Sequence, residues 1–227
     1  DSFMKAAVFG AGNMGLDIAQ VFAVKGHDVV VRDISDELIQ KGEERLKASL
    51  ARQVEKGRRT QAEADAISAK IVFTTNMRQA ADANLIVEAI VENVSIKKDL
   101  FRQLDTIVKP EAIFATNTSS ISPTELASAT KRADRFIGMH FFNPATVMKL
   151  IEVIRGANTS QETFTTVYEL AESLGKEPIE VAEAPGFVVN KILIPMINEA
   201  IGLVETGVAS VEDIDKAMML GANHPMG

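Results

Sequence analysis

The N-terminal part of the chain reads KAAVFGAGNMGLDIAQVFAVKGHDVVVRD from residue 5 to residue 33. An apolar run at 5–9 predicts a strand, 14–25 predicts a helix that Gly26 ends, and the β-branched run at 28–31 predicts a second strand. Between the first strand and the helix lies a Gly-x-Gly-x-x-Gly loop, where bare backbone and a helix N-terminus can contact a pyrophosphate. We expect a dinucleotide to bind this loop through Gly10, Gly12, Asn13, Met14 and Gly15. A glycine turn in an ordinary βαβ unit is the alternative.

Asp33 follows the second predicted strand and bears on the choice of cofactor. A carboxylate at this distance from the glycine-rich loop can accept hydrogen bonds from the hydroxyl groups of a ribose. It would repel a 2′-phosphate, whereas the neighbouring Arg32 would attract one. The pair therefore favours NAD over NADP, with NADP as the alternative.

Strand-like and helix-like segments alternate from residue 5 to about residue 181. The pattern predicts further strands at 71–73, 85–87, 112–115, 136–142, 147–154 and 178–181, and helices at 35–56, from Ser122, and from Thr159 to Gly175. Such alternation is typical of parallel strands joined by right-handed crossovers. The sequence therefore predicts an α/β fold with a Rossmann-like, doubly wound, mostly parallel sheet.

The pattern changes at residues 184–186, Ala-Pro-Gly. The segment 187–205 is apolar on nearly every side, as in a helix buried among other helices, and Ser210 is placed to cap a further helix at 211–220. We therefore predict an NAD-binding domain at residues 1–183 and the start of an all-helical C-terminal domain at 184–227. Two helices cannot cover so apolar an element, so we expect either a truncated C-terminus or a partner subunit.

The composition restricts the class of protein. The chain has 227 residues, no cysteine and a formal net charge of −7. The lack of cysteine excludes disulfides, a thiol nucleophile and Cys-based metal sites. An acidic chain does not favour nucleic acid, and no apolar run approaches the ~20 residues that span a membrane. Because the start also lacks an export signal, we expect a cytoplasmic protein whose partners include neither nucleic acid nor membrane.

Three histidines, His27, His140 and His224, are the candidates for an imidazole acid or base. His27 falls in the turn before the second strand and is predicted to be solvated. His224 falls in the terminal segment and is predicted to lie in a loop or a helix cap. His140 falls at the end of a predicted strand, at the edge of the sheet where open α/β folds bind ligands. It is the candidate catalytic base, and a half-buried structural histidine is the alternative.

Glu152 is a carboxylate inside the apolar strand at 147–154. Such a group either faces solvent or is buried against a cationic partner, and a protonated His140 would serve. In contact with His140, Glu152 would fix the tautomer of the ring and stabilise the imidazolium. Other polar residues follow strands at the same edge, namely Asn117, Ser119, Ser120 and Asn143. Ser119 lacks the Gly-x-Ser-x-Gly context of a hydrolase nucleophile, so we expect it to act as a hydrogen-bond donor.

Six motifs in this order resemble the 3-hydroxyacyl-CoA dehydrogenases over residues 4–227, and the short-chain bacterial 3-hydroxybutyryl-CoA dehydrogenases in particular. They are the glycine-rich loop at 10–15, VEAIVE at 87–92, NTSS at 117–120, HFFNP at 140–144, MKLIEV at 148–153 and PGFVVN at 185–190. The resemblance implies an enzyme that reversibly oxidises an (S)-3-hydroxyacyl-CoA, such as 3-hydroxybutyryl-CoA, to the 3-oxoacyl-CoA by hydride transfer to NAD. Family members continue beyond Gly227 and form homodimers through the C-terminal helical domain.

The resemblance also implies roles for individual residues. His140 matches the proton acceptor and Glu152 its carboxylate partner. Ser119 and Asn190 match residues that hold the substrate. Asp33 matches the ribose ligand, and the nicotinamide half is matched by Glu92, Lys97, Ser119 and Asn143. Hydride transfer needs only a proton acceptor, an orienting carboxylate and neutral donors, so no metal is expected.

A basic cluster at the end of the predicted helix at 35–56 consists of Arg52, Lys56, Arg58 and Arg59. Because coenzyme A carries phosphates, the cluster is a candidate CoA site, and Arg52 and Lys56 resemble the basic CoA-binding positions of the family. A solvated basic helix end is the alternative. Lys97 is also placed to reach an anionic group of either ligand.

Two other functions fit parts of the pattern. A β-hydroxyacid dehydrogenase acting on small free acids relies on a catalytic lysine, so Lys191 rather than His140 would face the nicotinamide. A non-catalytic nucleotide-binding protein of the same fold is the second alternative. The presence of Ser119, His140, Glu152 and Asn190 argues against it.

Overall fold

The computed structural model describes residues 3–227, so residues 1 and 2 of the predicted first domain lie outside the described residues. The chain divides into two compact units, one that ends at Pro185 and one that runs from Gly186 to Gly227. The first unit contains the sheet and its covering helices, and the second contains α7 (Val189–Glu205) and α8 (Val211–Gly221). No helix among residues 3–227 is both long enough and apolar enough to cross a membrane.

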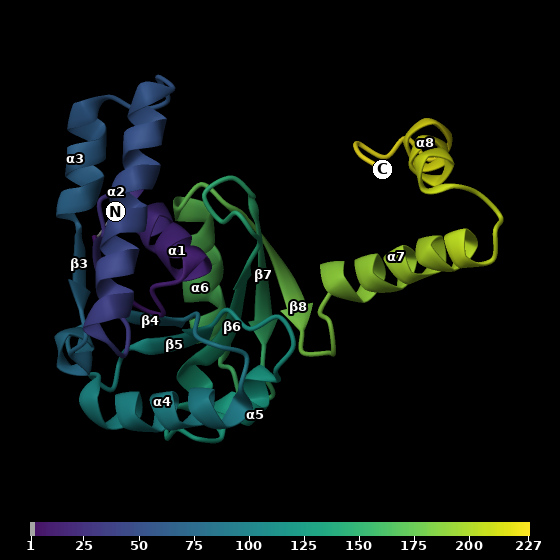
Figure 1. The fold of residues 1–227 in the computed structure, drawn as a ribbon. Helices are drawn as coiled ribbons and strands as arrows, with labels where there is room; N and C mark the ends of the chain where they lie inside the picture. Colours follow the sequence, from purple (N-terminus) through teal and green to yellow (C-terminus); the bar gives the residue numbers. More distant parts are fainter. Residues whose placement is uncertain (1–2) are drawn as a thin grey trace. The chain divides into compact units, whose positions relative to one another are not determined.

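The first unit is built on an eight-stranded sheet with the strand order β3-β2-β1-β4-β5-β6-β7-β8 (Figure 1). In chain order the strands are β1 (Lys5–Phe9), β2 (Asp28–Arg32), β3 (Ile71–Thr74), β4 (Leu85–Glu88), β5 (Ile113–Thr116), β6 (Phe136–Phe141), β7 (Leu150–Arg155) and β8 (Glu177–Ala182). All neighbours are parallel except β6 and β7. Because the first six strands have the order of a dinucleotide-binding doubly wound sheet, the predicted Rossmann-like, mostly parallel fold is confirmed.

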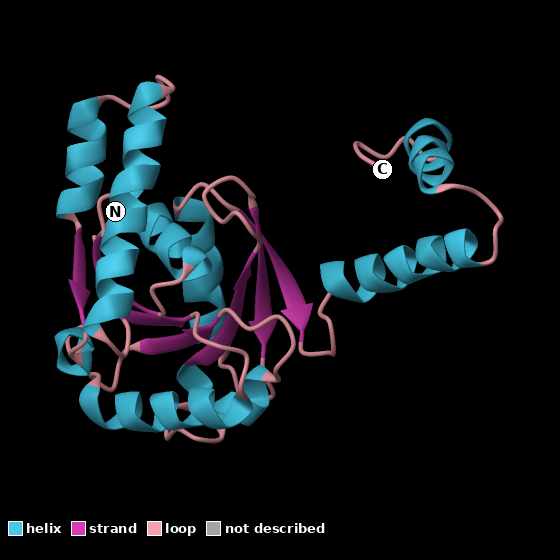
Figure 2. Cartoon of the chain, in the orientation of Figure 1, coloured by secondary structure: helices cyan, strands magenta, loops and turns pink. Residues whose placement is uncertain are grey.

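Helices cover both faces of the sheet (Figure 2). One face packs against α1 (Asn13–Val24), α2 (Asp36–Glu55), α3 (Gln61–Ala69) and α6 (Gln161–Ser173). The other packs against α4 (Val94–Ile107) and α5 (Pro123–Ala127). The short 3-10 helices η1 (Met77–Ala80) and η2 (Ala133–Arg135) lie in the connections. In β1, Ala6 and Val8 belong to the first core whereas Ala7 and Phe9 belong to the second, which explains why this strand is a continuous apolar run.

The connection between β6 and β7 departs from the expected alternation of strand and helix. It contains no helix, and the two strands pair antiparallel. The strand predicted at 147–154 starts only at Leu150, because the backbone N–H groups of Val147 and Met148 both donate to the carbonyl of Pro144 and form a turn. We call residues 142–149 the β6–β7 loop.

Two further local predictions are wrong. Ser160 rather than Thr159 caps α6, since the Ser160 hydroxyl accepts from Thr163 N and the Thr159 hydroxyl donates to the carbonyl of Phe136. His27 is buried rather than solvated. Its Nδ1 accepts a hydrogen bond of 3.1 Å from Met4 N, and its ring packs edge-on against Phe22.

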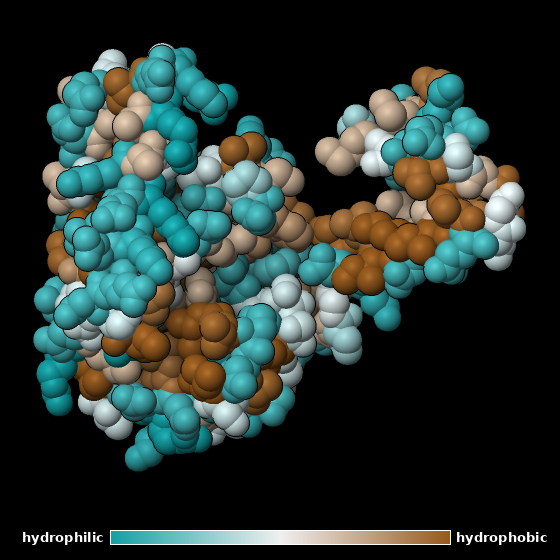
Figure 3. All heavy atoms as spheres, viewed as in Figure 1, coloured by the Kyte–Doolittle hydropathy of each residue, from teal (hydrophilic) through white to brown (hydrophobic). Residues whose placement is uncertain are grey.

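In the second unit, α7 carries apolar side chains that are exposed along its length, among them Ile192, Ile194, Ile197 and Ile201. In Figure 3 the brown spheres of apolar residues follow this helix. Ser210 caps α8 as predicted, because its hydroxyl accepts from Asp213 N.

Candidate active site

The candidate cofactor and catalytic residues of the first unit lie at one edge of the sheet. The glycine-rich loop follows β1, Glu92 follows β4, Ser119 follows β5, and His140 is the penultimate residue of β6. These four strands are adjacent and parallel. Since neighbouring strands are about 4.8 Å apart, their carboxyl ends form one continuous rim, which is where ligands bind in such sheets.

The three glycines of the loop are needed for different reasons. Gly10 has φ +115°, and a Cβ there would lie 2.4 Å from the carbonyl oxygen of Ala89. A Cβ on Gly15 would lie 1.8 Å from the carbonyl oxygen of Gly10, so the fold itself requires both glycines. A Cβ on Gly12 would have no described atom within 4 Å. Gly12 is the N-cap of α1, so the space beside it is where a phosphate can approach the helix N-terminus.

Asp33 is held at this loop by its own hydrogen bonds. Its Oδ2 accepts from Ala11 N and its Oδ1 from Ile34 N, both at 2.8 Å. Gly10, Gly12 and Asp33 line a cavity of about 640 Å³ whose other walls are largely apolar, with Ile34 and Ile90 among them. Figure 3 shows apolar atoms gathered between α2 and α4, where this cavity opens. The cavity therefore combines a ribose acceptor, a phosphate-accessible helix end and apolar walls suited to an aromatic base.

Arg32, the candidate partner of a 2′-phosphate, lines the same cavity. Its Nε donates to the carbonyl of Thr75 at 3.1 Å, and its guanidinium lies 5.9 Å from the centre of the Phe9 ring. These contacts hold the guanidinium against the protein.

Glu92 lies in a polar cluster after β4. Its Oε2 accepts hydrogen bonds from the hydroxyls of Thr118, at 2.7 Å, and Ser120, at 2.9 Å. Its Oε1 lies 3.0 Å from Lys97 Nζ. Burial raises the pKa of Glu92, but the hydrogen bonds from Thr118 and Lys97 outweigh this effect and the net shift is downward. Glu92 is therefore a fixed carboxylate at the rim.

Lys97 was expected to reach an anionic group of either ligand, and in the structure it contacts two carboxylates of the protein. Its side chain is 1% exposed, and its ammonium lies between Glu92 and Glu88, 2.5 Å from Glu88 Oε2. Glu88 is fully buried and also accepts from the Thr116 hydroxyl at 2.7 Å and from Ile90 N at 2.9 Å. Lys97 therefore anchors the loop that carries Glu92. Sequence reasoning missed Glu88, whose signal is a carboxylate directly after the apolar run at 85–87.

His140 and Glu152 form a buried pair. They stand directly opposite each other in the antiparallel ladder of β6 and β7. His140 Nδ1 lies 3.0 Å from Glu152 Oε1, with His140 6% and Glu152 0% exposed. A carboxylate so fully desolvated is stable only beside donors or a cation, so the expected alternative of a solvent-facing Glu152 is excluded. Because the carboxylate faces Nδ1, the neutral ring carries its proton there, and Nε2 is the acceptor nitrogen of the ring.

The remaining site residues are placed as follows. Ser119 is half-buried in the segment after β5, next to the two hydroxyls that bind Glu92. The Asn117 side chain accepts a hydrogen bond of 2.8 Å from Phe141 N, which ties this segment to the strand of His140. Asn143 is exposed in the β6–β7 loop and borders a small cavity with Asn13. Asn190 lies in α7 of the second unit, and its role in the site stays a prediction.

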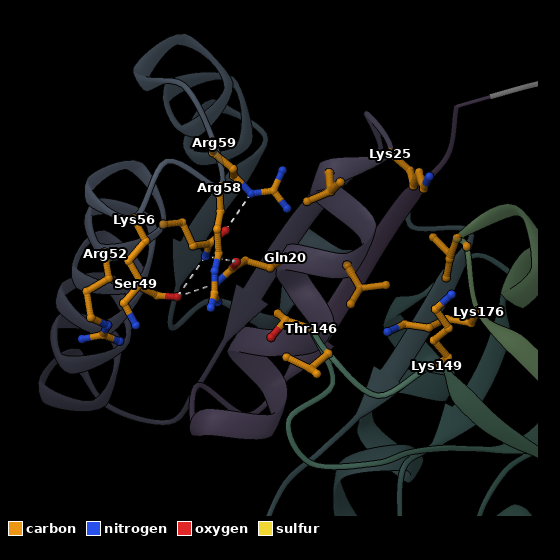
Figure 4. Close-up of a pocket in the computed structure, with 16 residues that line it drawn as sticks. Gln20, Lys25, Ser49, Arg52, Lys56, Arg58, Arg59, Thr146, Lys149 and Lys176 are labelled. Atoms are coloured by element: carbon orange, nitrogen blue, oxygen red, sulfur yellow. Dashed lines mark hydrogen bonds between the residues drawn. The ribbon is translucent and has the colours of Figure 1, made fainter.

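A second large cavity in the first unit, about 580 Å³, is strongly cationic (Figure 4). Among the described residues that line it, seven are basic and none is acidic: Lys25, Arg52, Lys56, Arg58, Arg59, Lys149 and Lys176. The predicted basic cluster thus faces a cavity, and three further lysines face it across α1. In a chain of net charge −7, such a concentration of positive charge is suited to an anionic ligand.

Comparison with known proteins gives the family. A model of the 3-hydroxyacyl-CoA dehydrogenase NAD-binding domain matches residues 5–184, and a model of the C-terminal domain of the same family matches residues 186–227. The chain belongs to the 3-hydroxyacyl-CoA dehydrogenase family. The resemblance found in the six motifs is thereby confirmed.

Individual members of the family are similar along nearly the whole chain. The 3-hydroxybutyryl-CoA dehydrogenase of Clostridioides difficile is 54% identical over 99% of this chain and 80% of its own length. The human mitochondrial hydroxyacyl-coenzyme A dehydrogenase is 44% identical over 97% of this chain and 72% of its own length. The crystal structure of (S)-3-hydroxybutyryl-CoA dehydrogenase from Ralstonia eutropha superposes with a TM-score of 0.96 at 48% identity, over 100% of this chain and 80% of that chain.

Proposed function

We propose that this member of the family is an NAD-dependent (S)-3-hydroxyacyl-CoA dehydrogenase that interconverts 3-hydroxybutyryl-CoA and acetoacetyl-CoA. The observation that carries the proposal is the buried His140–Glu152 pair, 3.0 Å apart, on the rim that also holds the glycine-rich loop. The family membership and the names of the similar proteins support the substrate class.

The proton moves through His140. In oxidation, His140 Nε2 accepts the proton of the 3-hydroxyl group while the hydride leaves C3 of the substrate. NAD supplies the chemistry of this step as the hydride acceptor. The ring thereby becomes an imidazolium, and Glu152 at Nδ1 stabilises its charge. Reduction reverses both transfers, because the imidazolium then returns the proton to the carbonyl oxygen, so the reaction is reversible.

Neutral donors would stabilise the reacting oxygen. In oxidation, negative charge develops on this oxygen as its proton leaves and is lost again as the hydride leaves C3. A preorganised hydroxyl or amide aimed at that charge lowers the barrier. We assign this role to the Ser119 hydroxyl and the Asn190 amide. Glu92 and Asn143 would hold the nicotinamide half of the cofactor.

The cofactor would be NAD rather than NADP. Asp33 is fixed by Ala11 N and Ile34 N at the cavity beside the glycine-rich loop, which suits a ribose diol and opposes a 2′-phosphate. Replacing Asp33 with serine should therefore raise the KM for NAD and lower the KM for NADP. An unchanged ratio of the two would exclude Asp33 as the selective residue.

The nucleotide part of coenzyme A would bind the cationic cavity. Arg52 and Lys56 line it from the end of α2, and a CoA thioester carries both a diphosphate and a 3′-phosphate. Arg52→Ala and Lys56→Ala should raise the KM for the CoA thioester and leave the KM for a pantetheine thioester unchanged.

The exposed apolar side chains of α7 support a homodimer formed through the helical unit. Multi-angle light scattering of the purified protein tests this, with twice the monomer mass expected. A monomer mass at micromolar concentration would contradict it.

Activity is tested by adding NADH and acetoacetyl-CoA to the purified protein and following the absorbance of NADH. We expect oxidation of NADH with acetoacetyl-CoA and none with free acetoacetate. Turnover of the free acid instead would favour a β-hydroxyacid dehydrogenase that uses Lys191. Tight NADH binding without turnover of either substrate would favour a non-catalytic protein.

A further inference from the structure

The β6–β7 loop connects the strand of His140 to the strand of Glu152 and borders two cavities. Asn143, near its start, lines a cavity of about 310 Å³ together with Asn13 and Asp17 of α1. Thr146, Val147 and Lys149, in its second half, line the cationic cavity. One loop therefore forms a wall of the candidate CoA site and carries a candidate cofactor residue.

The side chain of Lys176 binds backbone carbonyls of this loop. Lys176 lies between α6 and β8, and its Nζ donates to the carbonyl of Ala145 at 2.5 Å and to that of Met148 at 2.8 Å. The carbonyls of a loop lack the partners that a sheet would give them and need other donors. A lysine ammonium has three N–H donors, so it can bind two such carbonyls at once. Burial lowers the pKa of Lys176, while the charge of Asp17 opposes this shift. Figure 4 shows Lys176 beside Lys149, on the opposite side of the cavity from Arg52 and Lys56.

Asp17 of α1 lies near the same loop. Burial raises the pKa of Asp17, while Ala145 N and the charge of Lys176 oppose this shift. Ala145 is fully buried in the first core, and Lys176 binds its carbonyl. Its burial and this hydrogen bond together fix Ala145, and thereby where the residues on either side of it lie.

We propose that Lys176 is a positioning residue for both ligands. By holding the carbonyls of Ala145 and Met148, it keeps Asn143 at the cofactor side and Thr146 to Lys149 at the cationic cavity. It acts through the loop rather than as a phosphate ligand. The inference rests on the proposed function for the identity of the two ligands, NAD and a CoA thioester.

The test compares Lys176→Met with Lys25→Met, because Lys25 lines the same cavity from the C-cap of α1. For Lys176→Met we expect the Kd for NADH, measured by fluorescence, and the KM for acetoacetyl-CoA each to rise about tenfold, as for loss of hydrogen bonds to a charged group. The rise in KM should persist with a pantetheine thioester of acetoacetate, which lacks the phosphates of the nucleotide. Lys176→Arg should restore both constants to within about threefold, since a guanidinium can also donate to two carbonyls.

Lys25→Met should behave differently. It should raise only the KM for acetoacetyl-CoA, and this effect should vanish with the pantetheine thioester. If Lys176→Met matches this pattern, with unchanged NADH affinity, Lys176 is a phosphate ligand and the proposal is wrong. If Lys176→Met lowers the melting temperature but leaves both constants unchanged, its role is only structural and the proposal is equally wrong.

Asp17→Ala serves as a second variant if Lys176→Met does not fold. It removes the contact with Ala145 N and, like Lys176→Met, should raise the Kd for NADH. An unchanged Kd for NADH would overturn the proposal. NADH binding does not depend on the identity of the acyl substrate. Failure of the proposed activity is therefore distinguishable from failure of this inference.

Discussion

His140 and Glu152 are paired residues of one antiparallel ladder, and their side chains meet at 3.0 Å on the same face of the sheet. Directly opposite residues of an antiparallel pair have Cβ atoms about 4.5–5.5 Å apart, so the backbone itself brings the ring and the carboxylate together. This geometry depends on β7 running antiparallel to β6. If β7 followed a helical crossover and ran parallel to β6, this antiparallel pairing of His140 with Glu152 would not exist.

The first prediction concerns Glu152. Glu152→Gln preserves the size of the side chain but removes the charge that stabilises the imidazolium and fixes its tautomer. We expect kcat to fall by about 10²–10⁴-fold, with the Kd for NADH within about twofold of the wild-type value. Steady-state kinetics and NADH fluorescence measure the two constants.

A matched control is Glu180→Gln in the neighbouring strand β8. Glu180 is exposed and pairs with Arg155 at 3.3 Å. Its replacement should leave kcat unchanged. If Glu152→Gln and the wild type had equal kcat values, Glu152 would have no role in catalysis.

The second prediction separates the fold from cofactor binding in the glycine-rich loop. Gly12→Ala should fold with the wild-type melting temperature, because the added Cβ meets no described atom within 4 Å, but it should weaken NADH binding at least about tenfold by obstructing the pyrophosphate. Gly15→Ala should instead fail to fold stably, because its Cβ would lie 1.8 Å from the Gly10 carbonyl oxygen. Wild-type NADH affinity in Gly12→Ala would show that no phosphate lies beside this residue.

The third prediction concerns the buried ion pair of Glu88 and Lys97. Lys97→Met leaves the Glu88 carboxylate buried without its cation and should lower the free energy of unfolding by about 3–5 kcal/mol. The double variant Glu88→Gln/Lys97→Met should lose less than Lys97→Met alone. Urea denaturation measures both values.

Lys98→Met is the control for this pair. Lys98 is the next residue of α4, and its ion pair with Glu125, at 3.3 Å, is partly exposed. Its loss should cost no more than about 1 kcal/mol. A double variant less stable than Lys97→Met would show that Glu88 stabilises the fold through its other contacts.

Much of the fold was predictable because its signals are local. The glycine-rich loop is recognisable from residues 10–15 alone, and Gly15 is required by a local contact, because its Cβ would meet the carbonyl oxygen of Gly10. Buried strands such as β1 and β4 are short apolar runs, which are recognisable by their length, their apolar residues and the turn residues beside them. Ser210 is predictable as an N-cap because its accepting side chain and the donating N–H of Asp213 are only three residues apart.

Other features depend on contacts between distant residues. Helix α3 was not predicted, although Thr60 and Glu63 form a capping box, because it has few buried residues and lies between two basic or polar stretches. His27 is buried beside Phe22 and Met4, and its Nδ1 accepts from Met4 N, which is 23 residues away in the sequence. Lys97 was expected to reach an anionic group of a ligand, and only the fold shows that Glu88 and Glu92 contact its ammonium.

In the proposed reaction His140 Nε2 takes the proton of the 3-hydroxyl group, so this nitrogen must contact the reacting oxygen. A crystal structure of the protein with NAD and acetoacetyl-CoA measures this directly. We predict that His140 Nε2 lies about 2.6–3.2 Å from the C3 oxygen of the thioester, with Nδ1 still at hydrogen-bond distance from Glu152. An oxygen bound by Lys191 Nζ, with the His140 ring turned away from the ligand, would show that His140 does not take the proton.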